Sequence, residues 1–332
     1  MTDRRSLRTM VALAAAAAAI AGCGASAKPP APAANQTVVN GAGQATYPVS
    51  VTNCGRTLRF DHAPTRVISG WPTNTDLLEA LGLGTLVVGQ YNTSNGTPAP
   101  AYAAAAGRVP VLSEGPPTKE QLLAARPDLI WADGSYLFDG QQLPTIADLA
   151  AQGTQVLILS GFCTDDATKA KVTDVDTDLA TLGRIFGVEA SAARLRADLD
   201  NRLAAVTKKV TGQPAVPVAM ISTYNDSIYT YDGVYTDIAQ RAGARNIYAG
   251  TLPAGQYYAE LSKESIVKNN PATLVYLLSG GENEADARAF LARTLPTVRA
   301  VQSGRMIFLS QWDSTNLAGV QGVESLAAAL RP

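Results

Sequence analysis

Histidine is nearly absent from this chain of 332 residues, in which His62 is the single example. Sites for zinc and other transition metals gather several histidine, cysteine or carboxylate ligands, so the sequence argues against capture of a free metal ion. A Ser-His-acid triad would have to use this same histidine, which stands in a turn before the first expected strand. No glycine-rich phosphate loop follows a strand, and Ser279-Gly280-Gly281 is too short to be one. We therefore predict no catalytic residues, no metal site, no cofactor and no enzymatic activity.

Net charge is also close to zero. The 27 Lys and Arg residues offset 28 Asp and Glu residues, which leaves a formal charge of −1 at pH 7. This balance gives no electrostatic reason to expect nucleic acid or a membrane surface as a partner. With 46% hydrophobic and 17% charged residues, the composition is ordinary for a globular protein.

The N-terminus has the pattern of an export signal. Arg4, Arg5 and Arg8 precede an alanine-rich run over residues 10–20, which is too short to span a bilayer as a helix. The run closes on Ile20-Ala21-Gly22-Cys23, which resembles a bacterial lipobox. We predict a signal peptide over residues 1–23 and a lipid on Cys23, which would hold the exported protein on the outer face of the cell membrane. An ordinary signal peptide that happens to contain a cysteine is the alternative, and the choice between Sec and twin-arginine export stays open.

Residues 24–47 are rich in Ala, Pro, Gly, Gln, Asn and Ser and contain almost no large apolar side chains. Such a segment cannot bury enough surface to order itself, so we predict a flexible tether. Beyond it the chain is long enough for one large or two medium domains.

Cysteine is scarce, with three residues in the whole chain. If Cys23 carries a lipid, Cys54 and Cys163 remain. An even remainder in an oxidising compartment predicts one disulfide between them, and two unpaired thiols are the alternative.

Short β-branched runs alternate with helical patterns along the rest of the chain, which indicates an α/β fold with mostly parallel sheets. We expect two sets of four strands, at 66–69, 86–89, 129–131, 156–159, 218–221, 246–248, 274–278 and 306–309. This symmetry predicts two Rossmann-like lobes.

Two internal repeats support the two lobes. Thr75-Asp76-Leu77 with Gly82 is matched by Thr236-Asp237-Ile238 with Gly243. The segment from Thr118 to Leu123, followed by Pro127, is matched by Ser262 to Val267, followed by Pro271. In the second repeat the hydroxyl residue is placed to cap a helix, and the proline ends it before a strand.

Residues 188–210 contain neither proline nor glycine, and their apolar residues recur at steps of three and four. At about 1.5 Å per residue this helix would span roughly 35 Å, which is enough to connect two lobes. We therefore predict an N-terminal lobe over 48–187, a bridging helix over 188–210 and a C-terminal lobe over 211–332. A surface helix of one lobe is the alternative.

Two α/β lobes joined by one long helix behind a lipobox resemble the periplasmic binding proteins of iron-siderophore, haem and cobalamin ABC importers. The segments that carry the resemblance are 63–68, 75–89, 120–129 and 261–275. It implies a monomer that binds a small-molecule metal chelate and delivers it to an ABC-importer permease.

In that family each lobe presents a surface glutamate to arginines of the permease, and the matching positions here are Glu120 and Glu264. One carboxylate per lobe would orient a two-lobed carrier on a symmetric transporter by charge complementarity. The alternative is that each acid stabilises the first turn of its helix through the helix dipole.

A ligand cleft is expected between the lobes, where loops at the carboxyl ends of strands meet. Aromatic residues stand at or near several of these strand ends and are our candidates for ligand binding, although tyrosines in such places often only cover the core. The candidates are Trp71, Tyr91, Tyr136, Tyr224, Tyr231, Tyr257 and Trp312.

The same loops are poor in arginine, because Arg245 and Arg305 precede strands. An anionic siderophore would need arginines in the cleft, so a neutral ligand is favoured, with a hydroxamate-type ferric siderophore first and cobalamin next. Haem, with a tyrosine as axial ligand, is a further alternative. From other classes, an extracytoplasmic two-lobed enzyme and a sensor or adhesion lipoprotein stay open.

Overall fold

The computed structural model describes residues 45–163, 167–311 and 314–331. The predicted signal peptide, most of the predicted tether, the lipidation of Cys23 and the ligand contact of Trp312 lie outside these residues. The predicted domain boundaries and the predicted monomer stay predictions.

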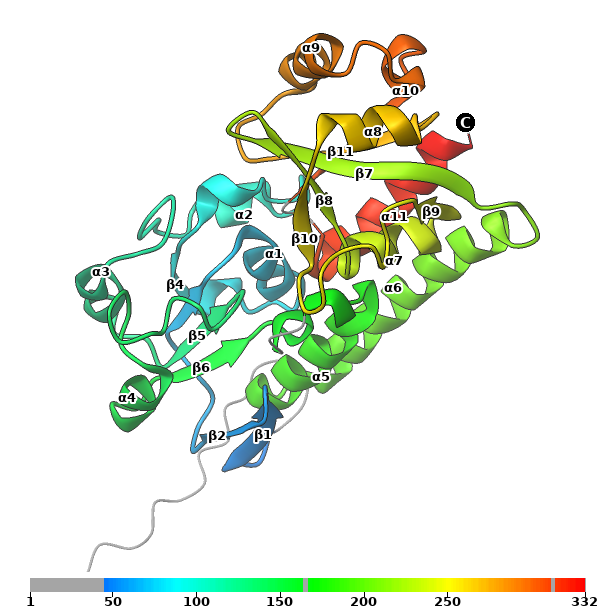
Figure 1. The fold of residues 1–332 in the computed structure, drawn as a ribbon. Coiled ribbons are helices and arrows are strands. Elements are labelled where there is room, and N and C mark those ends of the chain that lie inside the picture. The colour runs from blue at the N-terminus through cyan, green and yellow to red at the C-terminus, as the bar shows by residue number, and fades with distance from the viewer. Residues whose placement is uncertain (1–44, 164–166, 312–313, 332) are drawn as a thin grey trace, which may run out of the picture. The chain divides into compact units, whose positions relative to one another are not determined.

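The N-terminal lobe contains a parallel four-stranded sheet in the order β4-β3-β5-β6 (Figure 1). All four strands lie within one residue of the predicted segments: β3 Val67–Ser69, β4 Val87–Gln90, β5 Leu129–Ala132 and β6 Gln155–Ile158. Four helices follow these strands: α1 Pro72–Ala80, α2 Ala103–Ala106, α3 Lys119–Ala124 and α4 Ile146–Ala151. Short 3-10 turns occur at Gly84–Leu86, Thr93–Asn95, Ser160–Phe162, Ala167–Lys169 and Val172–Asp174.

The C-terminal lobe is built on a six-stranded sheet in the order β10-β8-β7-β11-β12, with β9 also paired to β7. Its strands are β7 Val216–Tyr224, β8 Ser227–Tyr231, β9 Ala244–Asn246, β10 Tyr258–Leu261, β11 Leu274–Leu278 and β12 Met306–Ser310. Its helices are α7 Val234–Arg241, α8 Lys263–Asn269, α9 Glu284–Thr294, α10 Arg299–Gln302 and α11 Asn316–Leu330. The predicted α/β fold with two lobes is confirmed.

Two β-hairpins are not predicted by the sequence pattern. The first joins β1 (Val49–Asn53) to β2 (Arg56–Phe60), and the second joins β7 to β8, which in turn pairs with β10. In each turn both central residues have positive φ, at Cys54 and Gly55 (50° and 71°) and at Asn225 and Asp226 (49° and 64°). This is the backbone of a two-residue type I′ turn, so β8 and β10 make the C-terminal sheet mixed rather than parallel.

The predicted long helix is present as α6, Glu189–Val210. Its apolar face buries Ala192, Leu199, Leu203 and Val206. It packs against α5 (Val175–Phe186) of the N-terminal lobe and against α7 and α11 of the C-terminal lobe, and Figure 1 shows α5 and α6 side by side. A two-hydrogen-bond ion pair between Arg202 and Glu324 fixes α6 to α11.

The lobes also meet directly. Asn316, at the start of α11, donates a hydrogen bond of 2.9 Å to the side-chain oxygen of Asn74 in α1. On the C-terminal lobe, the carboxylate of Asp237 accepts a 2.9 Å hydrogen bond from the backbone N–H of Val172. Asn74, Asn316, Asp237 and Val172 are all buried from solvent, so these hydrogen bonds between the lobes lie inside the protein.

The predicted repeat of α3 and α8 extends to the backbone. Thr118 and Ser262 each cap their helix by accepting a hydrogen bond from the backbone N–H three residues on. The residue before each proline, Arg126 or Asn270, has a positive φ (45° and 42°), the left-handed conformation in which helices commonly end, and the proline that follows cannot continue the helix. Helices α3 and α8 thus end in the same kind of turn.

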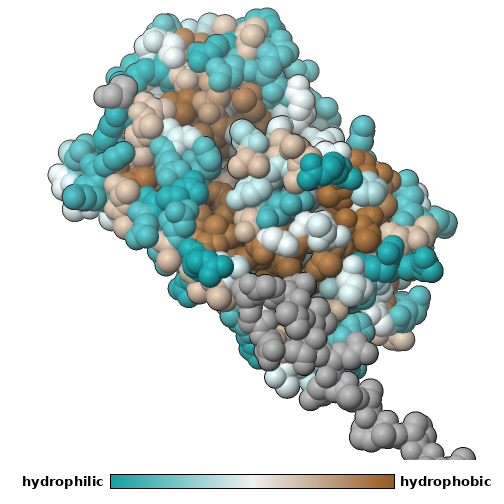
Figure 2. Space-filling view, turned by 180° about the vertical axis from the view of Figure 1, so that it is seen from behind, coloured by the Kyte–Doolittle hydropathy of each residue, from teal (hydrophilic) through white to brown (hydrophobic). Residues whose placement is uncertain are grey.

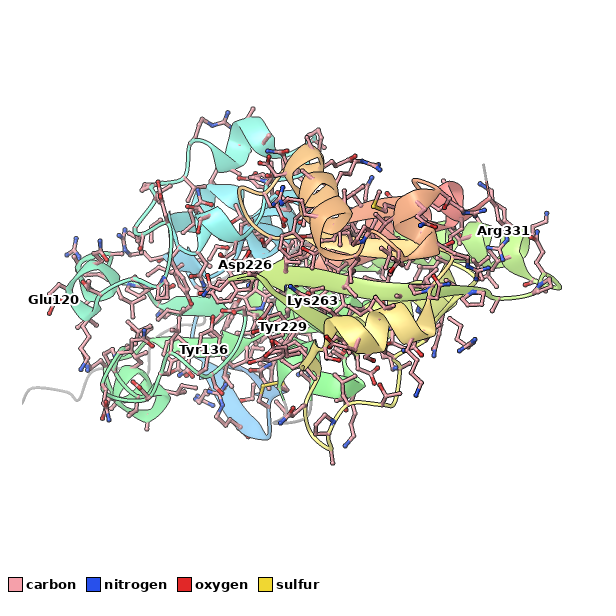
Figure 3. The ribbon with its side chains drawn as sticks, turned by 45° about the horizontal axis from the view of Figure 1, so that its top comes forward. Glu120, Tyr136, Asp226, Tyr229, Lys263 and Arg331 are labelled. Carbon is pink, nitrogen blue, oxygen red and sulfur yellow. A yellow bond between two sulfur atoms is a disulfide. The ribbon has the colours of Figure 1, made fainter. Side chains whose placement is uncertain are left out.

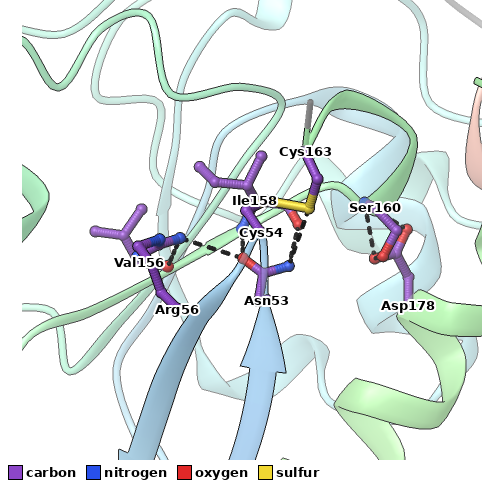
Figure 4. The surroundings of a disulfide bond; sticks show 8 residues. All are labelled: Asn53, Cys54, Arg56, Val156, Ile158, Ser160, Cys163 and Asp178. Atoms are coloured by element: carbon purple, nitrogen blue, oxygen red, sulfur yellow. Dashed lines mark hydrogen bonds between the residues drawn. A yellow bond between two sulfur atoms is a disulfide. The ribbon is translucent and has the colours of Figure 1, made fainter. Parts of the chain in front are cut away.

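Cys54 and Cys163 form the predicted disulfide, with a sequence separation of 109 residues. It joins the β1–β2 hairpin to the loop after β6, and Figure 4 shows the hydrogen bonds beside it. The side chain of Asn53 both accepts from the backbone N–H of Ile158 (2.8 Å) and donates to its carbonyl oxygen (2.7 Å). The hairpin is therefore fixed to the edge strand β6 by covalent and polar contacts together.

Replacing both cysteines (Cys54→Ser with Cys163→Ser) is expected to lower the free energy of unfolding by about 2–5 kcal/mol, because the open chain regains the entropy of a long loop. Urea denaturation followed by circular dichroism measures the change. Wild-type protein treated with reductant is the matched control and should reach the same midpoint as the variant. Equal midpoints for the oxidised wild type and the variant would contradict the prediction.

Asp178 is a fully buried carboxyl beneath the same loop. Its Oδ1 accepts from the Ser160 hydroxyl at 2.7 Å and from the Ser160 N–H at 3.1 Å (Figure 4). Burial raises the pKa of Asp178 to about 7, against the hydrogen bonds from Ser160, which lower it. The carboxyl therefore holds a proton in the folded protein at pH values where the unfolded chain has lost it.

Because the folded pKa is raised, the stability linked to Asp178 is largest below pH 4 and is lost as the pH rises to about 7. From pH 5 to pH 8 we expect the free energy of unfolding to fall by on the order of 1–2 kcal/mol more in wild type than in Asp178→Asn. Urea denaturation at pH 5, 6, 7 and 8 tests this. Asp133, Asp174 and Asp176, which also have raised pKa values, are present in both proteins and cancel in the comparison. Parallel pH profiles would refute it.

Candidate functional site

A cavity of about 380 Å³ lies between the two lobes. Most of its N-terminal wall comes from residues that follow strands of the parallel sheet, where the carboxyl ends of β3, β5 and β6 meet. The lining residues are Trp71, Asn95, Asp133, Gly134, Ser135, Tyr136, Leu159 and Phe162 from the N-terminal lobe and Tyr235, Tyr257, Ser314 and Thr315 from the C-terminal lobe.

Local structure fixes the position of the aromatic side chains that line the cavity. Trp71 stands between β3 and the proline that opens α1, so its ring is fixed at the strand end with 9% of its surface exposed. Tyr257 precedes the edge strand β10, and its ring packs edge-on against Tyr258 and Phe162. Tyr235 lies on α7 and donates a hydrogen bond to the carbonyl oxygen of Gln311. The cavity is thus bounded by aromatic rings that are already held by neighbours.

Three of the candidate ligand contacts, Trp71, Tyr136 and Tyr257, are brought together in this cavity. Their contact with a ligand stays a prediction. Trp312 lies outside the described residues.

Three other candidates are elsewhere. Tyr91 is fully buried in the N-terminal core, where it lies so close to Gly70 that a Cβ there would come within 2.6 Å of the tyrosine hydroxyl. Tyr231 is buried as well, and its hydroxyl forms a hydrogen bond with the Ser222 hydroxyl and accepts one from the Gln311 amide. Neither tyrosine lines the cavity, and a ligand contact of either stays a prediction.

Tyr224 is 68% exposed at the tip of the β7–β8 hairpin and does not line the cavity. The sequence pattern predicts a strand that ends at Ile221, but β7 continues to Tyr224 because the type I′ turn pairs the extension with β8. Tyr224 therefore lies past the end of the expected strand, and its contact with a ligand stays a prediction.

Asp133 was missed, although it is the first polar residue after β5 and stands before a glycine. Its Oδ2 accepts a hydrogen bond of 2.8 Å from the Tyr136 hydroxyl, and its Oδ1 is buried with no hydrogen-bond partner. Burial raises the pKa of Asp133 to about 6, while hydrogen bonds from the Tyr136 hydroxyl and from the backbone N–H groups of Asp133 and Gly134 lower it. Burial and the nearby Asp133 carboxylate raise the pKa of Tyr136, so the phenol stays protonated at neutral pH.

A larger cavity of about 760 Å³ adjoins the cleft and shares Tyr235 and Ser314 with it. It is lined by α6, α11, β12 and the loop 97–102, with many apolar side chains. Figure 2, which views the protein from behind, shows apolar residues in several patches on that face. This cavity lies away from the ends of β3, β5 and β6, so the smaller cleft with its polar groups is the better candidate for ligand recognition.

The predicted docking residues are exposed. Glu120 is the second residue of α3 and Glu264 the second residue of α8, so they occupy equivalent positions in the two lobes. A hydrogen bond from its own backbone N–H and one from Thr118 lower the pKa of Glu120, which keeps it ionised at neutral pH. In Figure 3, Tyr136 of the cleft lies between Glu120 and Lys263, the neighbour of Glu264. Their role in docking stays a prediction.

Within residues 45–163, 167–311 and 314–331, no His, Cys, Asp or Glu residues gather in a group that could hold a metal ion. None of the helices in the described part of the chain is both long and apolar enough to cross a membrane.

Two α/β lobes, a long connecting helix and a cleft at the carboxyl ends of the strands define a two-lobed solute-binding protein. The chain belongs to the periplasmic binding protein family, whose profile matches residues 67–311. The resemblance noted from the sequence is confirmed. Members of this family are substrate-binding proteins of ABC importers for siderophores, haem or cobalamin.

Three relatives illustrate the likeness. A cobalamin-binding protein of Halobacterium salinarum is 27% identical over 257 residues, which are 74% of this chain and 63% of that protein's length. A periplasmic binding protein from Veillonella parvula superposes with a TM-score of 0.74 at 25% identity, covering 85% of this chain and 97% of the other. The structure of an ABC-type Fe³⁺-hydroxamate transport system from Saccharomonospora viridis gives a TM-score of 0.69 at 24% identity, covering 86% of this chain and all of the other, and supports the fold.

Proposed function

We propose that this protein is the extracytoplasmic, lipid-anchored binding component of an ABC importer, and that its ligand is a metal chelate, with a ferric hydroxamate siderophore as the leading candidate. The observation that carries the proposal is the composition of the cleft. Its described lining combines aromatic rings and small polar residues with one carboxyl group and contains no lysine, arginine or histidine. Such a lining suits a ligand with an apolar periphery and no negative charge.

Electrostatics separates the siderophore classes. Ferric catecholates and carboxylates are anions, and proteins bind such groups with arginines that form charge-assisted pairs. Here an anion would approach Asp133 without a compensating cation on the described lining. A ferric trihydroxamate has a neutral metal centre and avoids this repulsion.

Cobalamin is the second candidate, because the Halobacterium salinarum relative carries that name and shares 27% identity with this chain. Most of the surface of cobalamin carries no strong negative charge, so the aromatic and polar lining of the cleft suits cobalamin as well. Cobalamin is therefore one of the ligands to be titrated.

A ferric trihydroxamate is expected to quench tryptophan emission on titration and to bind with a Kd in the micromolar range or tighter, whereas a ferric catecholate should produce little change. Trp71→Phe should remove a large part of the signal, because Trp71 lines the cleft while Trp131 is fully buried in the core. Tyr257→Ala should weaken binding by about tenfold, the effect of losing one aromatic contact and its buried area.

Tyr224→Ala is the matched control, since it removes an exposed tyrosine that does not line the cleft, and its affinity should equal that of wild type. Preference for the catecholate over the hydroxamate would refute the ligand assignment. Tight binding of cobalamin with no response to either siderophore would replace it with the second candidate.

Delivery to the permease is tested by Glu120→Ala with Glu264→Ala. Both residues are exposed and do not line the cleft, so ligand affinity should stay within twofold of wild type. Uptake by cells should fall by about tenfold or more, because two charge-assisted contacts with the permease are lost.

The control for this experiment is Asp61→Ala with Glu284→Ala, which removes one exposed carboxylate from each lobe at other positions. It should support normal uptake. Normal uptake by the Glu120/Glu264 variant would show that these residues do not dock and would favour a sensor or adhesion protein over an importer component.

A further inference from the structure

Asp133 is the one charged side chain among the described residues that line the cleft. One carboxylate oxygen accepts the Tyr136 hydroxyl at 2.8 Å, and the other, Oδ1, is buried without a hydrogen-bond partner. Asp133 and Tyr136 line the cavity together with Tyr235 and Tyr257 of the C-terminal lobe, so the Asp133–Tyr136 pair lies where the two lobes face each other.

A buried acceptor without a donor is rare in proteins, because its lost hydration is not replaced. The contrast with Asp178 is informative. Both oxygens of Asp178 accept hydrogen bonds from Ser160, as expected of a structural carboxyl. Asp133 lines the cleft instead, and its only side-chain partner is Tyr136, although the backbone N–H groups of Asp133 and Gly134 lie close enough to lower its pKa. A carboxylate in this position can accept a hydrogen bond from a donor on a ligand.

The groups around Asp133 cannot neutralise it. The titratable side chains that face it are tyrosines: Tyr136 from its own loop, Tyr91 from the end of β4 and Tyr257 from the loop before β10. The charge on Asp133 raises the pKa of each of them, after the larger effect of burial, so all three are neutral at pH 7. With a pKa of about 6, Asp133 is ionised at pH 7.5 and largely protonated at pH 5.

We propose that Asp133 is a specificity-determining residue of the cleft, and that it accepts a hydrogen bond from an ammonium or other N–H group at the periphery of the bound chelate. The cleft then selects a cationic chelate over a neutral one and a neutral one over an anionic one. This inference rests on the proposed function, because it concerns which chelate the same cleft retains.

A charge series of one ligand tests the proposal. The probes are a linear ferric trihydroxamate with a free terminal amine (charge +1), its N-acetylated form (neutral) and its N-succinylated form (charge −1), which share the metal centre. At pH 7.5 wild type should bind the amine form about tenfold more tightly than the acetylated form, as expected for one added charge-assisted hydrogen bond, and the succinylated form most weakly.

Asp133→Asn keeps the shape of the side chain and removes its charge. The three forms should then bind with affinities within about twofold of one another, because only effects other than the Asp133 charge remain. Asp61→Asn removes an exposed carboxylate that does not line the cleft and should keep the wild-type preference. The same preference should disappear in wild type at pH 5, where Asp133 is protonated, which tests the proposal without any substitution.

The outcomes separate this inference from the function it rests on. Equal affinity of wild type for the three forms, or an unchanged preference in Asp133→Asn, overturns the role of Asp133 and leaves the hydroxamate assignment standing. Binding of none of the three forms overturns both.

Discussion

The cleft depends on a buried pair of amide side chains that joins the two lobes. Asn316, at the start of the last helix, donates to Asn74 in the first helix, and Asn74 donates in turn to the carbonyl oxygen of Trp131 at the end of β5. All three residues are buried, so each lost partner would leave a polar group without water. This chain of hydrogen bonds fixes the end of β5, from which Asp133 follows, against the C-terminal lobe.

The same constraint limits how the lobes move. Three sets of contacts oppose a separation of the lobes. They are the Asn74–Asn316 hydrogen bond, the hydrogen bond from the Val172 N–H to Asp237, and the packing of α6 against α5 and α11. Helix α6 is 22 residues long and is held along its length, so it resists bending more than a pair of extended strands would.

The sequence predicted the features that follow from burial and periodicity. The parallel strands other than β9 were found because they are short, continuous apolar runs, and α6 because its apolar residues recur every three or four positions. The strand predicted at 246–248 begins where β9 (Ala244–Asn246) ends. The hairpins were missed because strands such as β10 alternate exposed and half-buried residues with little apolar content, and because turns such as Asn225-Asp226 were not read as type I′. Side-chain direction was the harder problem. Tyr91 follows its strand as Trp71 does, but its ring turns into the space left by Gly70, and no local pattern marks that difference.

Carboxylates illustrate how placement rather than residue type sets a role. Glu120 lies in the first turn of an exposed helix, where backbone and hydroxyl donors lower its pKa and water surrounds it, so it is a permanent charge at the surface. Asp178 is buried with its acceptors filled, so it is a structural group whose proton depends on pH. Asp133 lies between these cases, because it is sunk in the wall of the cleft with one oxygen paired and the other vacant. A buried charge without a counter-ion is costly in the empty protein. In the role proposed for Asp133, a donor on the ligand would offset part of that cost at pH 7.5, which would become a difference in affinity between ligands that carry such a donor and ligands that do not.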